Sequence, residues 1–478
     1  MQPHAHPFDR YATFTDVAML KAFSERPLRK SIRVNTLKMS VQECERRALA
    51  KGWQLKPVPW CSEAFFVERD DREQPIGKDL LHLLGHFYIQ EAASMLPAVL
   101  LQPQPHETVF DMSAAPGSKT TQMAALMQGR GVIVANDVQE RRLWTLHGAL
   151  HRLGVTNVIV TKKVGQWFAG HMTERFDRVL CDAPCTAQGT ARKDSDALRY
   201  ASAENIAKMA RLQSTLLEAA VHATKVGGRI VYSTCTLTPE ENEGVIAGLL
   251  NKFIDQVEII DPRTLSIAPE GFWDQAIHDS EKVQEMGELA SKRPLPCIRL
   301  WPQTYDTEGF FCAVLQKKAQ TRALMAVDTI PFSERELPRS RRDDIAERMM
   351  QQYGATFLRE DDRLFSRSES VVLAPKEVAW FSLPVQDDGL GLPFGKHLED
   401  GRVLLHHELV TLRGAEATRN VLALDGRQVD SLLCGHDTDC DASARGHQIL
   451  CFDGMAIGHG LAKEGHLKNN LQRWMIRS

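Results

Sequence analysis

Two cysteines lie where an open parallel sheet would bind a ligand. Cys185 follows one predicted strand in the segment CDAPCTAQGT (residues 181–190), and Cys235 lies near the end of another in IVYSTCT. The carboxyl ends of parallel strands line the ligand crevice of such a sheet, so both thiols can face one substrate, with Asp182 beside them. A thiolate is a nucleophile that forms covalent intermediates. Either cysteine taken alone is more often a small buried hydrophobe, and the pair is what favours catalysis.

A turn rich in small residues precedes the two cysteines. The segment DMSAAPGSKTTQ (residues 111–122) passes from a predicted strand into a helix, and its small side chains let the backbone approach a ligand. Pro116 and Gly117 favour a tight turn, and the helix N-terminus offers N–H groups to a carboxylate. Asp137 follows the next strand, where an acid accepts hydrogen bonds from ribose hydroxyls. The single glycine does not match the dinucleotide pattern, so we expect a nucleoside-bearing ligand without a pyrophosphate, and S-adenosylmethionine fits.

Methylation of cytosine at carbon 5 is a reaction that needs these groups together. Carbon 5 becomes nucleophilic only after a thiolate adds to carbon 6; a base then removes the hydrogen at carbon 5, and the thiolate leaves. The reaction therefore uses one nucleophile, one acid near ring nitrogen 3 and one group that assists release. A free thiol with a pKa of about 8.5 is mostly protonated at pH 7, so nearby positive charge helps, and Arg192 and Lys193 are close in sequence. Spacing alone leaves open which cysteine is the nucleophile.

The elements that must position these residues alternate between strands and helices from residue 106 to 316. Strands are predicted at 108–114, 131–137, 157–162, 176–183, 227–236 and 309–317, and helices at 118–128, 139–153 and 203–224. Apolar strands that alternate with helices predict an α/β fold with a doubly wound, largely parallel sheet.

The flanking segments predict further domains, as a chain of 478 residues requires. Residues 1–95 are predicted to form a small α+β unit, and 96–318 the catalytic domain. Residues 319–395 predict a charged, proline-containing linker or intermediate domain. Residues 396–478 predict a domain of short strands and turns with a basic tail.

The composition limits what the chain can bind. Hydrophobic residues make up 43% and charged residues 25%, and the formal net charge is −3, so any binding to RNA depends on local patches. The sequence has no apolar run near 18 residues and no signal-peptide pattern, which predicts a cytoplasmic protein that binds no membrane. Cys434, His436, Cys440 and His447 lack paired CxxC elements, so no metal site is expected.

The sequence closely resembles the RNA 5-methylcytosine methyltransferases of the Nop2/Sun (Fmu) family. The matching segments, in order from residue 26 to about 317, are RVNTLK, YIQEAASMLP, DMSAAPGSKTTQ, FDRVLCDAPCTAQG, GGRIVYSTCTLTPEENE and DTEGFFCA. The resemblance implies a Rossmann-like methyltransferase core that uses S-adenosylmethionine. It also implies a cytosine of 16S rRNA near the decoding site as the substrate, within the 30S subunit, and we expect a monomer.

The resemblance assigns roles that the spacing left open. It implies that Cys235 is the covalent nucleophile and that Cys185 helps to release the product. It places Asp182 near the methionine end of the cofactor and the target base, and Asp137 at the ribose. Relatives usually carry an acid near the adenine, where this chain has Val164. The other implied cofactor contacts are Ser113, Ala114, Ala115, Pro116, Gly117, Ser118 and Lys119.

Basic residues at both ends of the chain are predicted to bind RNA, because lysine and arginine neutralise phosphates. The tail DGMAIGHGLAKEGHLKNNL resembles the end of a PUA-type RNA-binding domain. The predicted RNA-binding residues are Arg26, Arg29, Lys30, Arg33, Lys38, Arg192, Lys193, Lys463 and Lys468.

Two alternative functions stay open at this point. One is a cytosine-5 methyltransferase that acts on another rRNA or on a tRNA. The other is an RNA-binding ribosome assembly factor without catalysis, which Val164 makes conceivable. A dinucleotide-dependent dehydrogenase is disfavoured because the required glycines are missing.

Overall fold

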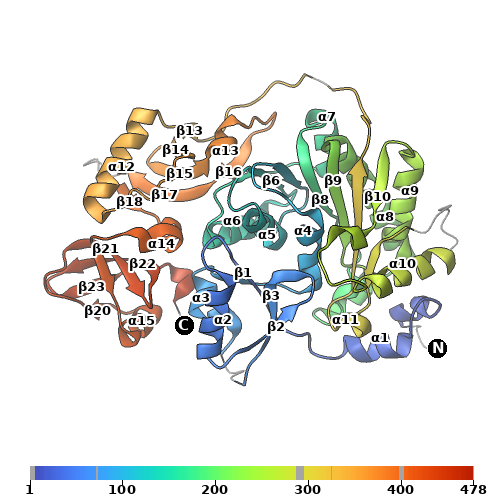
Figure 1. Ribbon diagram of the computed structural model, residues 1–478, viewed down its shortest axis with the longest axis horizontal. Coiled ribbons are helices and arrows are strands. Elements are labelled where there is room, and N and C mark those ends of the chain that lie inside the picture. The colour runs from blue at the N-terminus through green and yellow to red at the C-terminus, as the bar shows by residue number, and fades with distance from the viewer. Residues whose placement is uncertain (1–5, 71–73, 287–294, 325, 398–402, 477–478) are drawn as a thin grey trace.

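The computed structural model of the chain describes residues 6–70, 74–286, 295–324, 326–397 and 403–476. Its parts lie in a row (Figure 1). The α/β sheet occupies the middle and one side of the molecule, the N-terminal antiparallel sheet lies against it, and most of residues 335–397 and 403–476 form the opposite side.

The central sheet has the strand order β10-β12-β9-β8-β5-β6-β7-β16, with β11 paired to β12. The strands from β9 to β7 are parallel, whereas β10, β11, β12 and β16 pair antiparallel with their neighbours. The predicted α/β core is confirmed, and its last predicted strand is antiparallel. The strands are β5 (Thr108–Asp111), β6 (Val132–Asn136), β7 (Val158–Thr161), β8 (Phe176–Asp182), β9 (Thr224–Thr234), β10 (Val257–Ile260), β11 (Ile298–Leu300), β12 (Phe310–Lys317) and β16 (Asp387–Leu390).

Helices cover both faces of this sheet. Helices α4, α5, α6 and α10 share one apolar core with it, and α7, α8 and α9 share the other. Helix α6 packs against the sheet because its buried residues recur at helical spacing and so form one apolar face: Leu143, Leu146, Leu150 and Leu153. The helix ends at Gly154, which has a φ of +74°. The helices are α4 (Leu96–Leu101), α5 (Ser118–Leu126), α6 (Glu140–Leu153), α7 (Phe168–His171), α8 (Ala203–Ala223), α9 (Glu243–Lys252), α10 (Asp274–Met286) and α11 (Pro302–Tyr305).

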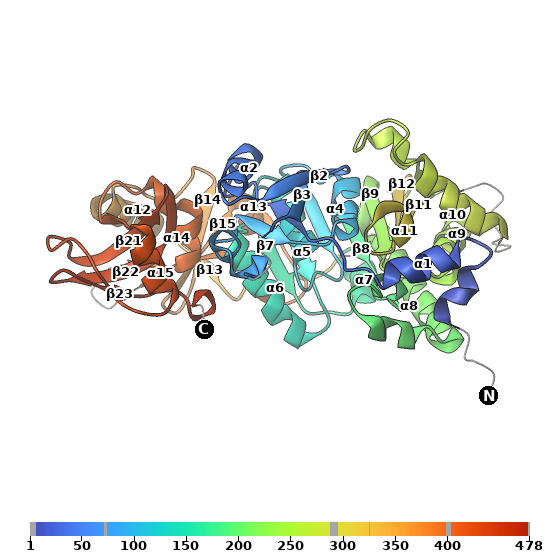
Figure 2. The same ribbon diagram turned by 90° about the horizontal axis from the view of Figure 1, so that it is seen from below.

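The N-terminal unit is an antiparallel sheet with the order β2-β3-β1-β4. Its first helix does not belong to it: α1 packs beside α11, and Leu20 is buried with Trp301 of the catalytic domain (Figure 2). The predicted α+β unit of residues 1–95 is therefore wrong for this first part of the chain. The elements are α1 (Val17–Ser24), β1 (Ser31–Val34), α2 (Val41–Ala50), β2 (Gln54–Val58), β3 (Cys61–Glu68), α3 (Leu80–Leu83) and β4 (Phe87–Ile89).

Residues 335–405 form a sheet with the order β13-β14-β15-β17-β18, where a linker was one expectation. This sheet spans the predicted boundary between 395 and 396, so that boundary cuts through hydrogen-bonded strands. Strand β16 leaves the segment and extends the central sheet beside β7. The other elements are β13 (Arg335–Glu336), α12 (Arg339–Tyr353), β14 (Asp362–Arg367), β15 (Ser370–Pro375), α13 (Lys376–Trp380), β17 (Leu392–His397) and β18 (Val403–Leu405).

The C-terminal part is a curled sheet with the order β19-β21-β22-β23-β20. It shares an apolar core with α3 of the N-terminal unit. No helix in the described ranges is both long and apolar enough to cross a lipid bilayer. The elements are α14 (His407–Arg413), β19 (Val421–Ala423), α15 (Gly426–Leu433), β20 (Thr438–Asp439), β21 (Gly446–Phe452), β22 (Met455–Lys463) and β23 (His466–Asn469).

Lys38 holds three parts of the chain together. Its ammonium donates hydrogen bonds of 2.9 Å to the carbonyls of Leu84 and Arg152 and to the hydroxyl of Thr411. These partners lie in the N-terminal unit, in α6 and in α14. Because all three donors are used inside the protein, the prediction that Lys38 binds RNA is wrong for this structure. Burial lowers the pKa of Lys38 from 10.5 to about 7.

This lowered pKa predicts a pH-dependent stability. Between pH 7 and 10.5 the unfolded chain binds a proton at Lys38 that the folded chain does not, so raising the pH favours folding. We expect the free energy of unfolding of the wild type, relative to Lys38→Met, to increase by about 2 kcal/mol between pH 7 and pH 9.5 in urea titrations. Lys30→Met, at an exposed lysine of the same segment, is the control. Equal pH slopes for wild type and Lys38→Met would contradict the assignment.

Candidate active site

The two predicted thiols meet at one edge of the central sheet. Strands β8 and β9 are parallel neighbours, and Cys185 and Cys235 follow their carboxyl ends. The two sulfur atoms are 3.3 Å apart, and both cysteines are half-buried and free. The hydrogen bond with Cys235 and burial raise the pKa of the Cys185 thiol well above its usual value. Either thiol can be the donor in this contact, so the geometry alone does not assign the two roles.

Asp182 and Lys119 form an ion pair beside the thiols. The Lys119 ammonium lies 2.7 Å from one carboxylate oxygen of Asp182, and the Ser233 hydroxyl donates to the other oxygen at 2.6 Å. Burial alone would lower the pKa of Lys119, but the Asp182 carboxylate raises it above its usual value. A cation is therefore fixed near Cys235, where positive charge stabilises a thiolate.

The predicted turn between β5 and α5 leaves backbone groups available. Gly117 has a φ of +107°, and a Cβ atom there would lie 3.0 Å from that of Ala149 and 3.1 Å from a methyl group of Leu146. Glycine is therefore required both by the backbone angle and by the close packing on α6. No side chain caps the N-terminus of α5, so its N–H groups can bind a carboxylate.

Asp137 lies against this turn, as the sequence predicts. Its side chain is 2% exposed, and its carboxylate accepts hydrogen bonds from the N–H groups of Ala115 at 3.3 Å and Gln139 at 3.0 Å. The Arg142 guanidinium lies 3.2 Å from the same carboxylate and also donates to the carbonyl of Ala115. The turn, the acid and the uncapped helix together fit a nucleoside that carries an amino-acid group, such as S-adenosylmethionine.

Two further residues predicted to bind RNA are buried. Arg33 is 2% exposed and donates to the carbonyl of Ser118 and the hydroxyl of Thr121, both at 3.0 Å. The Arg192 side chain is 1% exposed and lies 2.9 Å from the carboxylate of Asp306. Their role as phosphate contacts is wrong for this structure, because each guanidinium is used inside the protein. Arg33 instead supports the first turn of α5, directly behind the predicted cofactor turn.

The other basic residues predicted to bind RNA remain accessible. Arg29 is half-buried, with its guanidinium 3.5 Å from the ring centre of Phe66. The exposed ones are Arg26, Lys30, Lys193, Lys463 and Lys468.

Sequence reasoning missed three residues of the site. Asp111 is buried at the end of β5, where it accepts from the Thr120 hydroxyl at 2.7 Å, and burial raises its pKa to about 7. Arg142 and Glu241 were also missed. The position of Asp111 at a strand end was a usable signal, whereas the contacts of Arg142 and Glu241 depend on tertiary structure.

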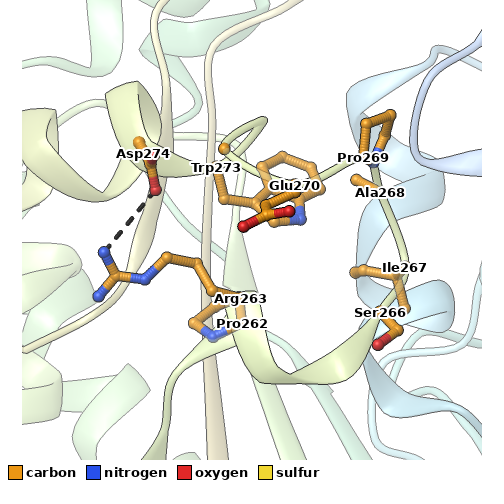
Figure 3. A pocket seen from close by; sticks show the side chains of 10 residues that line it. Pro262, Arg263, Ser266, Ile267, Ala268, Pro269, Glu270, Trp273 and Asp274 are labelled. Carbon is orange, nitrogen blue, oxygen red and sulfur yellow. Dashed lines mark ion pairs between the residues drawn. The ribbon is translucent and has the colours of Figure 1, made fainter.

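A hollow of about 470 Å³ lies elsewhere, between residues 262 and 274 (Figure 3). It contains no thiol, and the Arg263 guanidinium in it is paired with Asp261 at 2.6 Å and with Asp274 at 3.8 Å. No group of three or more His, Cys, Asp or Glu side chains suited to a metal ion occurs in the part of the chain that the structure describes. The thiol pair therefore remains the candidate site.

Comparisons with known proteins agree with this site. Residues 98–316 match the family of the 16S rRNA methyltransferase RsmB/F, and residues 13–92 match the N-terminal domain of 16S rRNA methyltransferase RsmF. The ribosomal RNA small subunit methyltransferase F of Aeromonas salmonicida is 37% identical over 95% of this chain and 92% of its own length. That of Vibrio cholerae is 36% identical over 97% and 94%.

The chain belongs to the RsmB/F family of 16S rRNA methyltransferases. Enzymes of this family use S-adenosylmethionine, and the turn before α5 and Asp137 provide a site that fits it.

Solved structures support the same fold. A methyltransferase homologue from Pyrococcus horikoshii is 38% identical, with a TM-score of 0.53 over 65% of this chain and 93% of its own. The NSun6 structure from Pyrococcus horikoshii with SFG is 22% identical, with a TM-score of 0.54 over 66% and 98%, and shows likeness of fold alone.

Val164 gives a prediction about cofactor affinity. It follows β7, which pairs with β6, the strand directly before Asp137, and it is 54% exposed. Because the family resemblance predicts an acid at this position, we expect Val164→Asp to bind S-adenosylmethionine about tenfold more tightly in calorimetry, since the added carboxylate can accept a hydrogen bond from the adenine amino group. Val226→Asp, at an exposed valine near the start of β9, should bind S-adenosylmethionine as tightly as the wild type does. Weaker binding by Val164→Asp would show that the adenine does not lie here.

Proposed function

We propose that the chain methylates carbon 5 of a specific cytosine in 16S rRNA, near the decoding site, through a covalent bond between Cys235 and carbon 6 of the base. The observation that carries this proposal is the 3.3 Å approach of the two sulfur atoms beside the Lys119–Asp182 ion pair. S-adenosylmethionine, when bound at the turn before α5, supplies an electrophilic methyl group. The side chains of the protein activate the base and hold it in place.

Cys235 is the nucleophile in this proposal. The protonated Cys185 thiol donates a hydrogen bond to its sulfur, and Lys119 supplies positive charge, so both neighbours favour the thiolate. Addition of the thiolate to carbon 6 moves electron density to carbon 5.

Asp182 orients the base. Its two oxygens are held by Lys119 and Ser233, so the carboxylate is fixed relative to both strand ends. A carboxyl group beside ring nitrogen 3 or the exocyclic amine stabilises the ring while carbon 6 is saturated. Lys119 therefore has two roles in this proposal: it holds the Asp182 carboxylate in place, and its positive charge stabilises the Cys235 thiolate.

The RNA must present its base to this site unstacked. We propose that the accessible basic residues Arg26, Lys30 and Lys193 contact the RNA near the site, and that the C-terminal sheet is a PUA-like RNA-binding domain with Lys463 and Lys468 at its surface. We propose the 30S subunit as the substrate particle.

Alanine variants of the two thiols separate their roles. Cys235→Ala is expected to lose methylation by at least a thousandfold and to form no covalent RNA adduct, because the nucleophile is gone. Cys185→Ala is expected to accumulate the adduct, because release is impaired. Methyl transfer and gel-shifted adduct are measured on the same 16S rRNA. Cys434→Ala, at an exposed thiol of the C-terminal part, should match the wild type. An adduct with Cys235→Ala would reverse the roles.

Two measurements decide against the alternatives. Bisulfite mapping of RNA from cells without the protein is expected to show the loss of one 5-methylcytosine in 16S rRNA; loss in a tRNA would assign another substrate. Calorimetry is expected to show S-adenosylmethionine binding, whereas absence of binding would favour a non-catalytic assembly factor.

A further inference from the structure

Glu241 lies directly behind the two thiols. It ends the short turn Pro239–Glu241 that follows β9, and it is 0% exposed. Its carboxylate is surrounded by hydrogen-bond donors from three different segments of the chain. Burial of a carboxylate destabilises the folded protein unless both of its oxygens accept hydrogen bonds. Glu241 therefore binds tightly the segments that supply its donors.

Glu241 binds the loop that carries Cys185. It accepts from the backbone N–H of Thr186 at 3.0 Å and from the Thr186 hydroxyl. Gln213 of α8 donates to the same carboxylate at 2.8 Å and to the carbonyl of Pro184 at 2.9 Å. The residues on both sides of Cys185 are therefore anchored, directly or through Gln213, to one carboxylate.

Glu241 also binds the segment that carries Cys235. The Thr238 hydroxyl donates to it at 2.8 Å, whereas the Thr236 hydroxyl, 3.4 Å away, donates to the Gln188 amide oxygen. The Tyr232 hydroxyl donates to its backbone carbonyl at 2.6 Å, which ties the turn back to β9. One carboxylate thus joins the segments of both cysteines.

The partners of this carboxylate are all donors. The four bonds from Thr186, Gln213 and Thr238 come from hydroxyl, amide and backbone N–H groups, an arrangement that a carboxylate satisfies and an amide does not. Glu243, two residues later, is a matched contrast. It is equally buried, but it pairs with the Arg299 guanidinium at 2.5 Å and makes no described bond to the Cys185 loop; Arg299 in turn donates to the carbonyl of Leu237, near Cys235, at 2.8 Å.

We propose that Glu241 is a positioning residue for product release, which sets the distance between the Cys185 and Cys235 sulfurs by binding both of their segments. The proposal rests on the function proposed above. It concerns a step after methyl transfer and does not make Glu241 touch the substrate.

The step that depends on this distance can be written in full. A water molecule takes the proton from carbon 5, that electron pair forms the double bond between carbons 5 and 6, and the bond from carbon 6 to Cys235 breaks. The sulfur keeps the electron pair, and the Cys185 thiol donates a hydrogen bond to it. The negative charge of Glu241 is a lesser contributor, after the hydrogen bond with Cys235 and burial, to the raised pKa that keeps Cys185 protonated. If the Cys185 loop moves, release slows.

The test compares Glu241→Gln with Glu243→Gln in the full-length chain on 16S rRNA. The amide at 241 places an NH₂ group against donors, so the Cys185 loop loses its anchor. We expect the fraction of enzyme held as covalent adduct at steady state to rise at least fivefold in Glu241→Gln. The rate of a single methyl transfer should fall by a smaller factor than the rate of adduct decay, because release is the step that depends most on the Cys185 loop. Glu243→Gln should lower the unfolding temperature and leave the adduct fraction at the wild-type value.

The pH profile adds a readout that a purely structural role would not move. Loss of the Glu241 charge removes one cause of the raised Cys185 pKa, so adduct decay in Glu241→Gln should begin to slow at a lower pH than in the wild type. If Glu241→Gln does not fold, Thr238→Val, which removes one 2.8 Å bond to the carboxylate, is expected to give a smaller rise in adduct.

Two results would contradict two different proposals, the role of Glu241 and the function of the chain. An adduct fraction in Glu241→Gln or Thr238→Val equal to that of the wild type, or a change no larger than that of Glu243→Gln, would overturn the proposal. Absence of any Cys235-dependent adduct in the wild type would instead contradict the proposed function itself.

Discussion

The register between β8 and β9 determines where every reacting group lies. Asp182 is paired with Ser233 across these two parallel strands, so the Ser233 hydroxyl reaches the Asp182 carboxylate. Both strands end at the same edge of the sheet. The short loops that follow them bring the sulfur atoms of Cys185 and Cys235 to within 3.3 Å of one another. A shift of one residue in either strand would turn its Asp182 or Ser233 side chain to the opposite face of the sheet and would move the loop that follows it. The chemistry of the site therefore depends on a pairing made deep in the core.

Some basic side chains of this protein form hydrogen bonds in its interior rather than lying at its surface. Lys38 joins the N-terminal unit to α6 and α14, and Arg33 supports the first turn of α5. Buried cations are costly unless their donors are bonded; the three bonds of Lys38 meet this need, whereas the Nε of Arg33 is buried without a hydrogen-bond partner. The segment of Arg33 and Lys38 thus joins the N-terminal unit both to the start of α5 and to α6 and α14.

The sequence predicted the parts of the fold that have local signals. Apolar strands, helical spacing in α6 and the small residues around Gly117 located the central sheet and the turn, and the thiols and Asp137 lie where these elements placed them. Charge patterns were a poorer guide, because a run of basic residues in a sequence does not show which side chains are buried. The pairing of β16 with β7 and the sheet from β13 to β18 depend on contacts between distant segments, so no local pattern could indicate them.

Glu241 illustrates the same limit within the site. The segment TPEEN offers neighbouring acids at 240 and 241, but only the tertiary structure shows that Glu241 is buried among donors whereas Glu240 pairs with Arg10. A carboxylate that touches no substrate can still set the geometry of two groups that do. Geometry of this kind is carried by hydrogen bonds that span 28 to 55 residues of sequence.

Identification of the sulfur that bonds to the base is the most direct test of this account. The chain would be incubated with S-adenosylmethionine and 16S rRNA that contains 5-fluorocytidine, in which no proton can be removed from carbon 5, so the covalent intermediate persists. After digestion, mass spectrometry locates the nucleotide on a peptide. We predict that it is bonded to Cys235. A nucleotide bonded to Cys185, or methylated product without any adduct, would contradict the account.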